Sequence, residues 1–434
     1  MTAPRYGMFA DLYELTMAAS FHAAGLPSTV TFDLFVRSLP PRRDFLVACG
    51  IDTALDRLVD FRFSDGDLAY LLTLGLFSNQ FLDRLGELQF TGDIRAVAEG
   101  DLVYAGEPLM TVSAPIIEAQ LVETLLINTV AYETMVASKA ARVTMACGSR
   151  SFVDFSARRD HGVDAAVSAA RAAYVGGAAG TSLVLAGQRY GLPLSGTMAH
   201  SYVMAHDDEI DAFRSYLRSY GSASVLLIDT YDTPEGARRA VAAMDELGVA
   251  ARGVRLDSGD LAELAKQVRV ILDDGGYPGV QILASGDLDE DRVAELMAAG
   301  APIDAFGVGT RLGTSADAPY LGMVYKLVEQ DGEPRVKLAP GKKTLPGLKQ
   351  IWRYSDHDLI ALDGEDVPPG GRPLLAPVWR GEGRLRPEVA LSEARDRCLN
   401  ALAERPATPG FEVRISPRLE ALADAAAADV ADRM

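Results

Sequence analysis

Apolar and polar positions follow two different periods along the first third of the chain. Residues 29–37 alternate apolar and polar side chains and are rich in β-branched and aromatic types, which predicts a strand. In residues 51–88 and 118–148 apolar positions recur every three or four residues, which predicts helices, one of them starting at Ser64. Residues 92–115 contain Gly and Pro turns and predict short strands between them.

From residue 149 the pattern changes to short apolar runs that alternate with amphipathic helices, which is typical of βα units around a parallel sheet. Four successive predicted strands end in polar, Gly-rich clusters. The four are SVLLI before Asp229, ARGVRL before Asp257, VQILA before Ser285 and Gly286, and IDAFGV before Gly309 and Thr310. Turns of this kind need caps and glycines in any case, so one cluster alone would mean little. Four in a row, on the face where barrel enzymes build their sites, favour a functional site.

Two further segments complete the expected organisation. Thr233 followed by Pro234 predicts a helix cap with proline at the first helical position. After Lys326 the pattern shifts again, with Gly and Pro dispersed through residues 331–390. Residues 416–434 are rich in alanine and predict an exposed terminal helix.

Composition places the chain among globular proteins. It has 434 residues, 48% of them hydrophobic and 24% charged, which excludes a disordered, collagen-like or coiled-coil protein. This length fits two or three domains, or one large α/β barrel with additions. The net charge of −18 argues against affinity for nucleic acid or an anionic membrane, because both need a basic face. A small anionic substrate remains open, since a local arginine cluster can oppose the overall sign.

The cysteines and the N-terminus point to a reducing compartment. Three widely spaced cysteines, Cys49, Cys147 and Cys398, form neither a disulfide framework nor a zinc motif. The first residues lack the basic and apolar regions of a signal peptide, and no apolar run is long enough to span a membrane. We therefore expect a cytoplasmic protein.

Common catalytic motifs are absent, and the remaining candidates are ambiguous on their own. HExxH, CxxC, GxSxG and a complete P-loop do not occur, and the GKKT at residues 341–344 lacks the upstream glycine of a P-loop. The glycines of residues 307–309 do not continue into a dinucleotide fingerprint, yet they could present N–H groups to a phosphate. His200 could be structural or functional, and its six-residue spacing from His206 argues against a shared metal.

Two other side chains stay open in the same way. Arg158, next to Arg159, is either a solvated charge or part of an anion clamp, because arginine forks suit phosphate and carboxylate groups. Tyr13 lies in a predicted amphipathic helix near the N-terminus, where ordinary core packing would also explain it.

A series of ordered motifs resembles the nicotinate phosphoribosyltransferase family, a group of type II phosphoribosyltransferases. The motifs extend from residue 10 to about residue 353, and their joint occurrence in this order is highly specific. They read ADLYELTMAASFHAAG, FVDFSARRDHG, ARAAYVGGAAGTS, LSGTMAHSYVMAH, LIDTYDT, VRLDSGDL, GVGT and KLAPGKKTLPGLKQ.

The resemblance implies a fold and a reaction. The fold would be an irregular (β/α) TIM-like barrel at residues 149–328, between an N-terminal mixed α+β domain (1–148) and a C-terminal extension (329–434) packed on that domain. The reaction would convert nicotinate and 5-phosphoribosyl 1-pyrophosphate (PRPP) to nicotinate mononucleotide and pyrophosphate, coupled to ATP hydrolysis, in NAD salvage. ATP and Mg²⁺ are the implied cofactors, and a homodimer with shared active sites is the implied assembly.

The resemblance also assigns the nicotinate side of the site. The pyridine nitrogen is unprotonated at neutral pH, so the reaction needs an aromatic slot and a carboxylate anchor and does not need a general base. Phe155 and Tyr13 would flank the ring, with Tyr13 contributed by the other subunit. Arg255 and Thr197 would bind nicotinate, and Ser201, from the hydroxyl-bearing GTMAHS segment, would also contact substrate.

The remaining roles concern ribose, phosphate and ATP. Asp229 and Asp257 would hold the ribose hydroxyls and Mg²⁺, the metal being bound mainly through pyrophosphate. Arg158 would meet phosphate, and His200 matches the family's phosphohistidine, which ATP phosphorylates. The 5-phosphate would be received by the backbone and hydroxyl donors of Gly286, Gly309 and Thr310.

Two positions depart from the family pattern, and three alternatives are considered. Ser156 and Asp160 stand where many members have glycine and glutamine; Ser156 would narrow the ring pocket, and Asp160 would add a negative charge beside the arginines.

A nicotinamide phosphoribosyltransferase would share the fold, but the GTMAHS hydroxyls suit a carboxylate. A catalytically dead, ligand-binding barrel is disfavoured by the joint retention of His200, Arg255, Asp257 and Thr310. An aldolase-like barrel would need a strand-end lysine, which the four clusters lack.

Overall fold

The computed structural model describes residues 5–338, 344–405 and 411–433. The chain forms two compact units: a terminal unit made of Met1–Met135 and Tyr320–Met434, and a central unit made of Val136–Pro319. Residues 339–343 of the KLAPGKKTLPGLKQ motif, including most of the GKKT sequence, lie outside the described residues.

The terminal unit contains a seven-stranded sheet, in the order β12-β11-β1-β5-β3-β16-β17. Residues 29–37 form a strand as expected, β1 (Thr29–Val36), which is paired antiparallel on both sides. Two polar positions of β1, Thr31 and Asp33, are nevertheless buried. The buried Asp33 forms an ion pair of 2.8 Å with the equally buried Lys349 and accepts a hydrogen bond from Thr111, which compensates its charge.

The helices of the terminal unit begin and end at local signals. The apolar segment 51–88 folds as three helices, and Ser64 caps the second of them with a capping box, as expected. The last helix was expected to be exposed, but it buries Leu419, Ala423 and Ala426, whose spacing of three and four residues gives it an apolar face. The helices are α1 (Leu12–Ala24), α2 (Ile51–Val59), α3 (Asp65–Thr73), α4 (Asn79–Gly86), α5 (Ile116–Leu121), α15 (Leu391–Glu404) and α16 (Pro417–Asp432).

The segment rich in Gly and Pro, residues 331–390, forms short strands where the structure describes it. A four-stranded sheet has the order β15-β13-β14-β18, and β2 pairs with β4. The remaining strands of the terminal unit are β2 (Leu46–Val47), β3 (Asp93–Ala96), β4 (Leu102–Val103), β5 (Pro108–Pro115), β11 (Met323–Gln330), β12 (Glu333–Pro334), β13 (Lys349–Arg353), β14 (His357–Leu362), β15 (Arg372–Pro373), β16 (Ala376–Arg380), β17 (Gly383–Arg384) and β18 (Glu412–Ile415).

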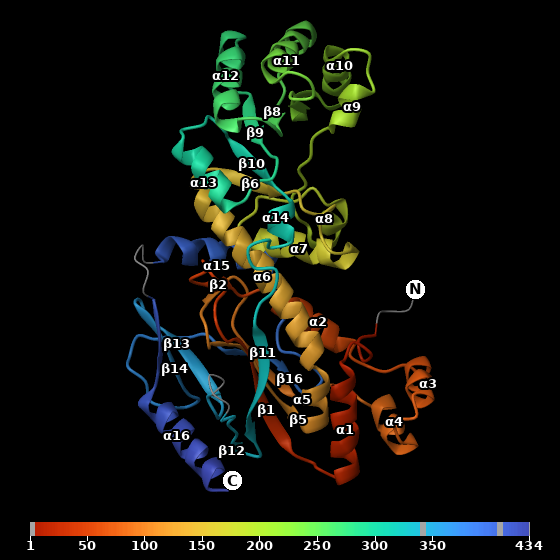
Figure 1. Ribbon diagram of the computed structural model, residues 1–434, viewed down its shortest axis with the longest axis vertical. Helices are drawn as coiled ribbons and strands as arrows, with labels where there is room; N and C mark the ends of the chain where they lie inside the picture. The colour runs from red at the N-terminus through yellow and green to blue at the C-terminus, as the bar shows by residue number, and fades with distance from the viewer. Residues whose placement is uncertain (1–4, 339–343, 406–410, 434) are drawn as a thin grey trace. The chain divides into compact units, whose positions relative to one another are not determined.

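The central unit is an α/β fold around a parallel sheet, in the order β6-β10-β9-β8-β7 (Figure 1). All of its described pairings are parallel, and βα units connect β7 to β10, as the sequence predicted. The strands are β6 (Ser151–Asp154), β7 (Val225–Leu227), β8 (Gly253–Leu256), β9 (Gln281–Ala284) and β10 (Ala305–Val308). Each strand contributes a fully buried apolar residue to one core: Phe152, Leu226, Val254, Ile282 and Phe306.

Helices with clear caps connect these strands. The predicted cap at Thr233 is wrong by one residue, because Asp232 accepts the hydrogen bond from Glu235 N and Pro234 lies within the first turn. Asp260 and Asp289 cap the next two long helices. The helices are α6 (Glu123–Cys147), which continues from the terminal unit, α7 (Val163–Val175), α8 (Val184–Tyr190), α9 (His200–Met204), α10 (Glu209–Tyr220), the 3₁₀ turn η1 (Gly221–Ala223), α11 (Thr233–Leu247), α12 (Leu261–Asp274), α13 (Glu290–Ala298) and α14 (Thr310–Gly313).

The expected barrel is not closed in the described residues. The sheet is open, with β6 and β7 as its edge strands. Beyond β6 the pairing continues only as two isolated parallel bridges, Asp154 with Thr181 and Thr181 with Leu194. Pro193 has no N–H to donate to a ladder, so this part of the chain adds single-residue bridges where a barrel would need strands.

The boundary between the two compact units lies within α6, and both ends of the chain belong to the terminal unit. The central unit begins before residue 149, because the second half of α6 packs in it: Thr144 Oγ1 donates to Gly176 O at 2.7 Å. The two ends of the chain share one unit because β16 pairs with β3 in the same sheet. None of the helices that the structure describes is long and apolar enough to cross a membrane.

Candidate active site

The carboxyl ends of the five parallel strands lie at the same edge of the central sheet, because parallel strands all run in one direction. A cavity of about 390 Å³ lies at this edge, within the size range of small-molecule sites. Six residues predicted from the sequence line this cavity: Phe155, Arg158, Thr197, His200, Arg255 and Asp257.

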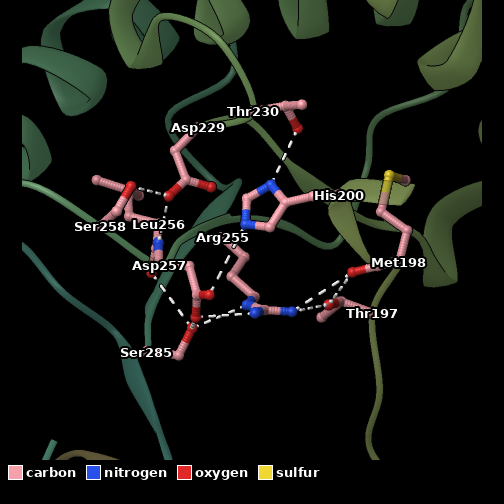
Figure 2. Close-up of polar contacts among 10 residues, drawn as sticks. All are labelled: Thr197, Met198, His200, Asp229, Thr230, Arg255, Leu256, Asp257, Ser258 and Ser285. Carbon is pink, nitrogen blue, oxygen red and sulfur yellow. Dashed lines mark hydrogen bonds and ion pairs between the residues drawn. The ribbon is translucent and has the colours of Figure 1, made fainter. Parts of the chain in front are cut away.

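Arg255, on β8, has all three guanidinium nitrogens engaged (Figure 2). Nε donates to Ser285 Oγ at 2.8 Å, Nη1 donates to Thr197 Oγ1 at 2.7 Å, and Nη2 lies 2.8 Å from Asp257 Oδ1. The side chain is only 12% exposed. A planar fork held on three sides is a preorganised group for binding a carboxylate at the cavity.

Ser285 and Asp257 complete a closed hydrogen-bonded triangle with Arg255. The buried Ser285 hydroxyl accepts from Arg255 and donates to Asp257 Oδ1 at 2.5 Å. Burial alone would raise the pKa of Asp257, but the hydrogen bonds from Ser285 and Arg255 and the charge of Arg255 outweigh burial and lower the pKa. Asp257 is therefore an ionised carboxylate at neutral pH, facing the cavity.

His200 begins the short helix α9, and each of its ring nitrogens has a polar side chain nearby. Nδ1 lies 3.2 Å from Thr230 Oγ1, and Nε2 lies 3.8 Å from Asp257 Oδ2 (Figure 2). The side chain is 41% exposed, so the oriented ring remains accessible to a ligand. An imidazole with a hydrogen-bonded hydroxyl at one nitrogen and a nearby carboxylate is a suitable arrangement for a histidine nucleophile.

Asp229 follows β7 and points toward the end of β8 (Figure 2). Its Oδ2 accepts hydrogen bonds from Asp257 N at 2.9 Å and from Ser258 Oγ at 2.6 Å. Its Oδ1 is buried and has no hydrogen-bond partner among the described residues. Asp229 and Asp257 are thus neighbouring carboxylates with oxygen available to a hydroxyl group or a divalent cation.

Phe155 and Arg158 follow β6, and both line the cavity. The guanidinium carbon of Arg255 lies 6.0 Å from the centre of the Phe155 ring. The ring packs so closely on Gly307 that a Cβ there would lie 2.5 Å from it, so only glycine fits. Arg158 is exposed and forms no side-chain hydrogen bond or ion pair with another described residue, so its charge is available to an anion at the cavity.

The two departures from the family pattern, Ser156 and Asp160, contact each other. Ser156 Oγ donates to Asp160 Oδ2 at 3.0 Å, and Ser156 is fully buried. Burial raises the pKa of Asp160 to about 6, a shift that the Ser156 hydrogen bond partly opposes. The expected effects, a narrower ring pocket and a charge against the arginines, are not what the structure describes, because neither residue lines the cavity and both pack against Gly313.

The proposed phosphate residues follow β9 and β10. Gly286 has a φ of +100°, and a Cβ there would lie 2.1 Å from Asp257 O, so the turn requires glycine. Gly309 and Thr310 begin the short helix α14, with a Cβ on Gly309 only 3.0 Å from Phe155 O. Because these glycines have no side chain, the backbone of both turns can lie close to the neighbouring strand ends.

Six predicted site residues are outside the set that lines the cavity: Tyr13, Ser201, Asp229, Gly286, Gly309 and Thr310. Tyr13 belongs to α1 in the terminal unit, where its hydroxyl interacts with Glu123 and burial together with nearby carboxylates raises its pKa. Ser201 is exposed on α9 next to His200, but it lies outside the set of lining residues. Their roles therefore stay predictions.

Sequence reasoning missed Ser285 as a site residue and missed the support beneath the site. The buried Asp154 accepts hydrogen bonds from Ser156 N at 2.9 Å and Thr181 Oγ1 at 2.8 Å, which fixes the turn that carries Phe155. Ser285 stood in the sequence as one of four strand-end clusters, which was a usable signal. For Asp154 the only signal in the sequence was a polar residue within an apolar strand.

Comparisons with known proteins agree along the chain. Residues 8–131 match the model of the nicotinate phosphoribosyltransferase N-terminal domain, and residues 150–343 match the model of the nicotinate phosphoribosyltransferase family. A nicotinate phosphoribosyltransferase of Mycobacterium tuberculosis is 47% identical over 397 residues, covering 90% of this chain and 85% of the relative. One of Bacillus subtilis is 42% identical over 374 residues, covering 82% of this chain and 76% of the relative.

A solved structure shows the same fold. The crystal structure of human nicotinic acid phosphoribosyltransferase superposes with a TM-score of 0.85 at 28% sequence identity, covering 96% of this chain and 99% of that chain.

Proposed function

The chain belongs to the nicotinate phosphoribosyltransferase family, and from this premise we propose how its residues carry out the reaction. Nicotinate and PRPP give nicotinate mononucleotide and pyrophosphate, a step of NAD salvage. The observation that carries the proposal is the Arg255 fork, held on three sides at a cavity that Phe155 also lines.

Nicotinate binds between an aromatic ring and a cation. Phe155 offers a face for the pyridine ring, and Arg255 with Thr197 receives its carboxylate through charge-assisted hydrogen bonds. The ring nitrogen is then aimed at the anomeric carbon of PRPP. Because that nitrogen already carries a lone pair, the protein contributes orientation and electrostatic stabilisation and no proton transfer.

The two carboxylates act on the ribose. Asp229 and Asp257 accept hydrogen bonds from the ribose hydroxyls and place negative charge beside the oxocarbenium-like carbon as pyrophosphate leaves. Their oxygens also suit Mg²⁺, and the unpartnered buried Oδ1 of Asp229 supports that fit. When bound, Mg²⁺ supplies positive charge that stabilises the pyrophosphate leaving group.

Phosphate and ATP contact the same edge of the sheet. The phosphate groups of PRPP bind to two sets of donors. One is the side chain of Arg158, whose charge has no described partner, and the other is the backbone at Gly286 and Gly309 together with Thr310. ATP phosphorylates His200, and hydrolysis of the phosphohistidine drives synthesis. The oriented, accessible ring of His200 supports this role.

One assay tests the proposal. Purified protein is mixed with PRPP, Mg²⁺ and either nicotinate or nicotinamide, with and without ATP, and the mononucleotide is measured. We expect product from nicotinate, more of it with ATP, and little from nicotinamide. If product forms with nicotinamide and not with nicotinate, the nicotinamide alternative replaces the proposal. Binding of the substrates without product would favour a catalytically dead barrel.

Ser285→Ala is expected to lower kcat/KM for nicotinate roughly 10-fold or more, because a hydrogen bond to a charged group contributes about 1.5–3 kcal/mol. Arg255 Nε would lose its acceptor and Asp257 would lose a donor. The pKa of Asp257 would then rise, moving the acid limb of the pH–rate profile to higher pH. Ser219→Ala, which removes an exposed hydroxyl that donates to Ser215 O within α10, is the matched control. An unmoved acid limb in Ser285→Ala would contradict the triangle's role.

We also propose a homodimer that shares its active sites, working in a reducing cytoplasm. Tyr13 is 45% exposed, and Phe9, Leu12 and Met17 expose apolar side chains in the same N-terminal segment, which supports a second copy as the group that covers them. Cys49, Cys147 and Cys398 are buried and form no disulfide with one another, which supports the compartment.

Mixed dimers test the shared site. Tyr13→Ala and Arg255→Ala proteins are each expected to be poorly active alone. If Tyr13 serves the partner's site, a mixed dimer contains one doubly damaged site and one intact site, and activity recovers toward half of the wild-type value. The measurement is activity against the fraction of mixed dimer after subunit exchange. A mixed dimer without recovery would refute the shared site.

A further inference from the structure

A network of buried charges lies behind the two turns to which phosphate is assigned. Lys139, on α6, has a side chain that is only 2% exposed. Its Nζ lies 2.5 Å from Glu290 Oε2 and 2.8 Å from Asp317 Oδ1, and Arg142 Nε donates to Glu290 Oε1 at 2.9 Å. Removing an ammonium group from water is costly, so a lysine at this depth must be paired, and here two carboxylates pair with it.

Both carboxylates belong to segments that continue the phosphate turns. Glu290 is the first residue of α13, four residues after Gly286. Asp317 lies shortly after α14, the helix that Thr310 begins. Lys139 therefore joins the segment after β9 to the segment after β10 and attaches both to α6.

A second ion pair joins the same two segments, the one after β9 and the one after β10. Arg311, directly after Thr310, donates to Asp289 Oδ2 at 2.5 Å, and Asp289 Oδ1 caps α13. Burial would raise the pKa of Asp289, but its hydrogen bonds from Arg292 N and Arg311 and the charges of Arg311 and Lys139 lower it. Helix α14 is thus held at its start through Arg311 and beyond its end through Asp317.

We propose that Lys139 is a positioning residue for PRPP: its ion pairs with Glu290 and Asp317 set the spacing between the turn at Gly286 and the turn at Gly309 and Thr310. The inference rests on the proposed function, which assigns those turns to phosphate. Lys139 does not line the cavity and does not touch nicotinate. Its effect should therefore fall on one substrate only.

The test compares Lys139→Met with Lys139→Arg and with a control on α13, Arg292→Met, which removes an exposed ion pair to Glu295. Since a misplacement of about 1 Å can cost roughly 100-fold, we expect Lys139→Met to raise KM for PRPP by roughly 10- to 100-fold while KM for nicotinate is unchanged. Lys139→Arg should recover part of the loss, and Arg292→Met should behave as wild type.

Calorimetric titration of each variant with PRPP, without nicotinate or ATP, provides a readout independent of turnover. Weakened PRPP binding in Lys139→Met supports positioning even if the wild type shows no turnover with nicotinate, an outcome that would overturn the proposed function alone. Equal increases in both KM values, or a loss of folded protein with unchanged KM values, would overturn the inference. If Lys139→Met does not fold, Asp317→Asn, whose side chain is 19% exposed, is measured in the same way and decides by the same split.

Discussion

Arg255→Lys is expected to lower kcat/KM for nicotinate by roughly 10- to 100-fold, with most of the loss in KM for nicotinate. The guanidinium group makes three directed contacts at once, to Ser285, Thr197 and Asp257, and a lysine ammonium on a different stem cannot reproduce this planar pattern. One lost hydrogen bond between charged groups accounts for about 1.5–3 kcal/mol, which corresponds to that range.

The measurement is steady-state kinetics with nicotinate and PRPP varied separately. Arg252→Lys is the matched control, because Arg252 is exposed and lies just before the same strand. Circular dichroism should show an unchanged fold in both proteins, since Arg255 lies at the carboxyl end of β8 and outside the apolar core. Near-normal use of nicotinate by Arg255→Lys would show that the carboxylate anchor lies elsewhere.

Removing the charge altogether adds a pH effect. In Arg255→Met, burial of Asp257 would no longer be opposed by the arginine, so the pKa of Asp257 would rise from its lowered value. The carboxylate would then be protonated at a higher pH than in the wild type. The acid limb of the kcat/KM profile should therefore move to higher pH in Arg255→Met and move less in Arg255→Lys, where a positive charge remains.

The parts of the site that could be predicted from sequence are those that local pattern determines. A strand that ends in a polar cluster is readable within about ten residues, and parallel pairing then brings the clusters of Asp229, Asp257, Ser285 and Gly309 to one edge. Phe155 was assigned through the family resemblance, whereas Arg158 was already a candidate for anion binding from its residue type; both line the cavity.

The parts that could not be predicted depend on pairs distant in sequence. Ser285 acts on Arg255 across 30 positions, and a serine in a Gly-rich turn has an ordinary explanation as a turn residue. The open sheet depends on how residues 192–199 pair, which no local period encodes. Ser156 and Asp160 appeared as two separate departures until their side chains were seen to bond to each other.

His200→Ala is expected to abolish nicotinate-stimulated ATP hydrolysis while slow, ATP-independent formation of nicotinate mononucleotide persists. In the proposed reaction His200 accepts the phosphoryl group of ATP, whereas the attack on ribose is made by the pyridine nitrogen of nicotinate. Removing the imidazole therefore removes the coupling and leaves Arg255, Asp229 and the phosphate turns in place.

Two further variants test whether the orientation of the His200 ring matters for ATP hydrolysis. Thr230→Val removes the hydroxyl 3.2 Å from His200 Nδ1 and should slow ATP hydrolysis roughly 10-fold, the value of one net hydrogen bond. His206→Ala removes a second histidine of the same segment, whose ring bonds Tyr202 O and lies outside the cavity lining, and should leave coupling intact. The readout is phosphate released from ATP per mononucleotide formed, together with acid-labile ³²P on the protein. Full ATP stimulation in His200→Ala would refute the phosphohistidine, because no other histidine lines the described cavity.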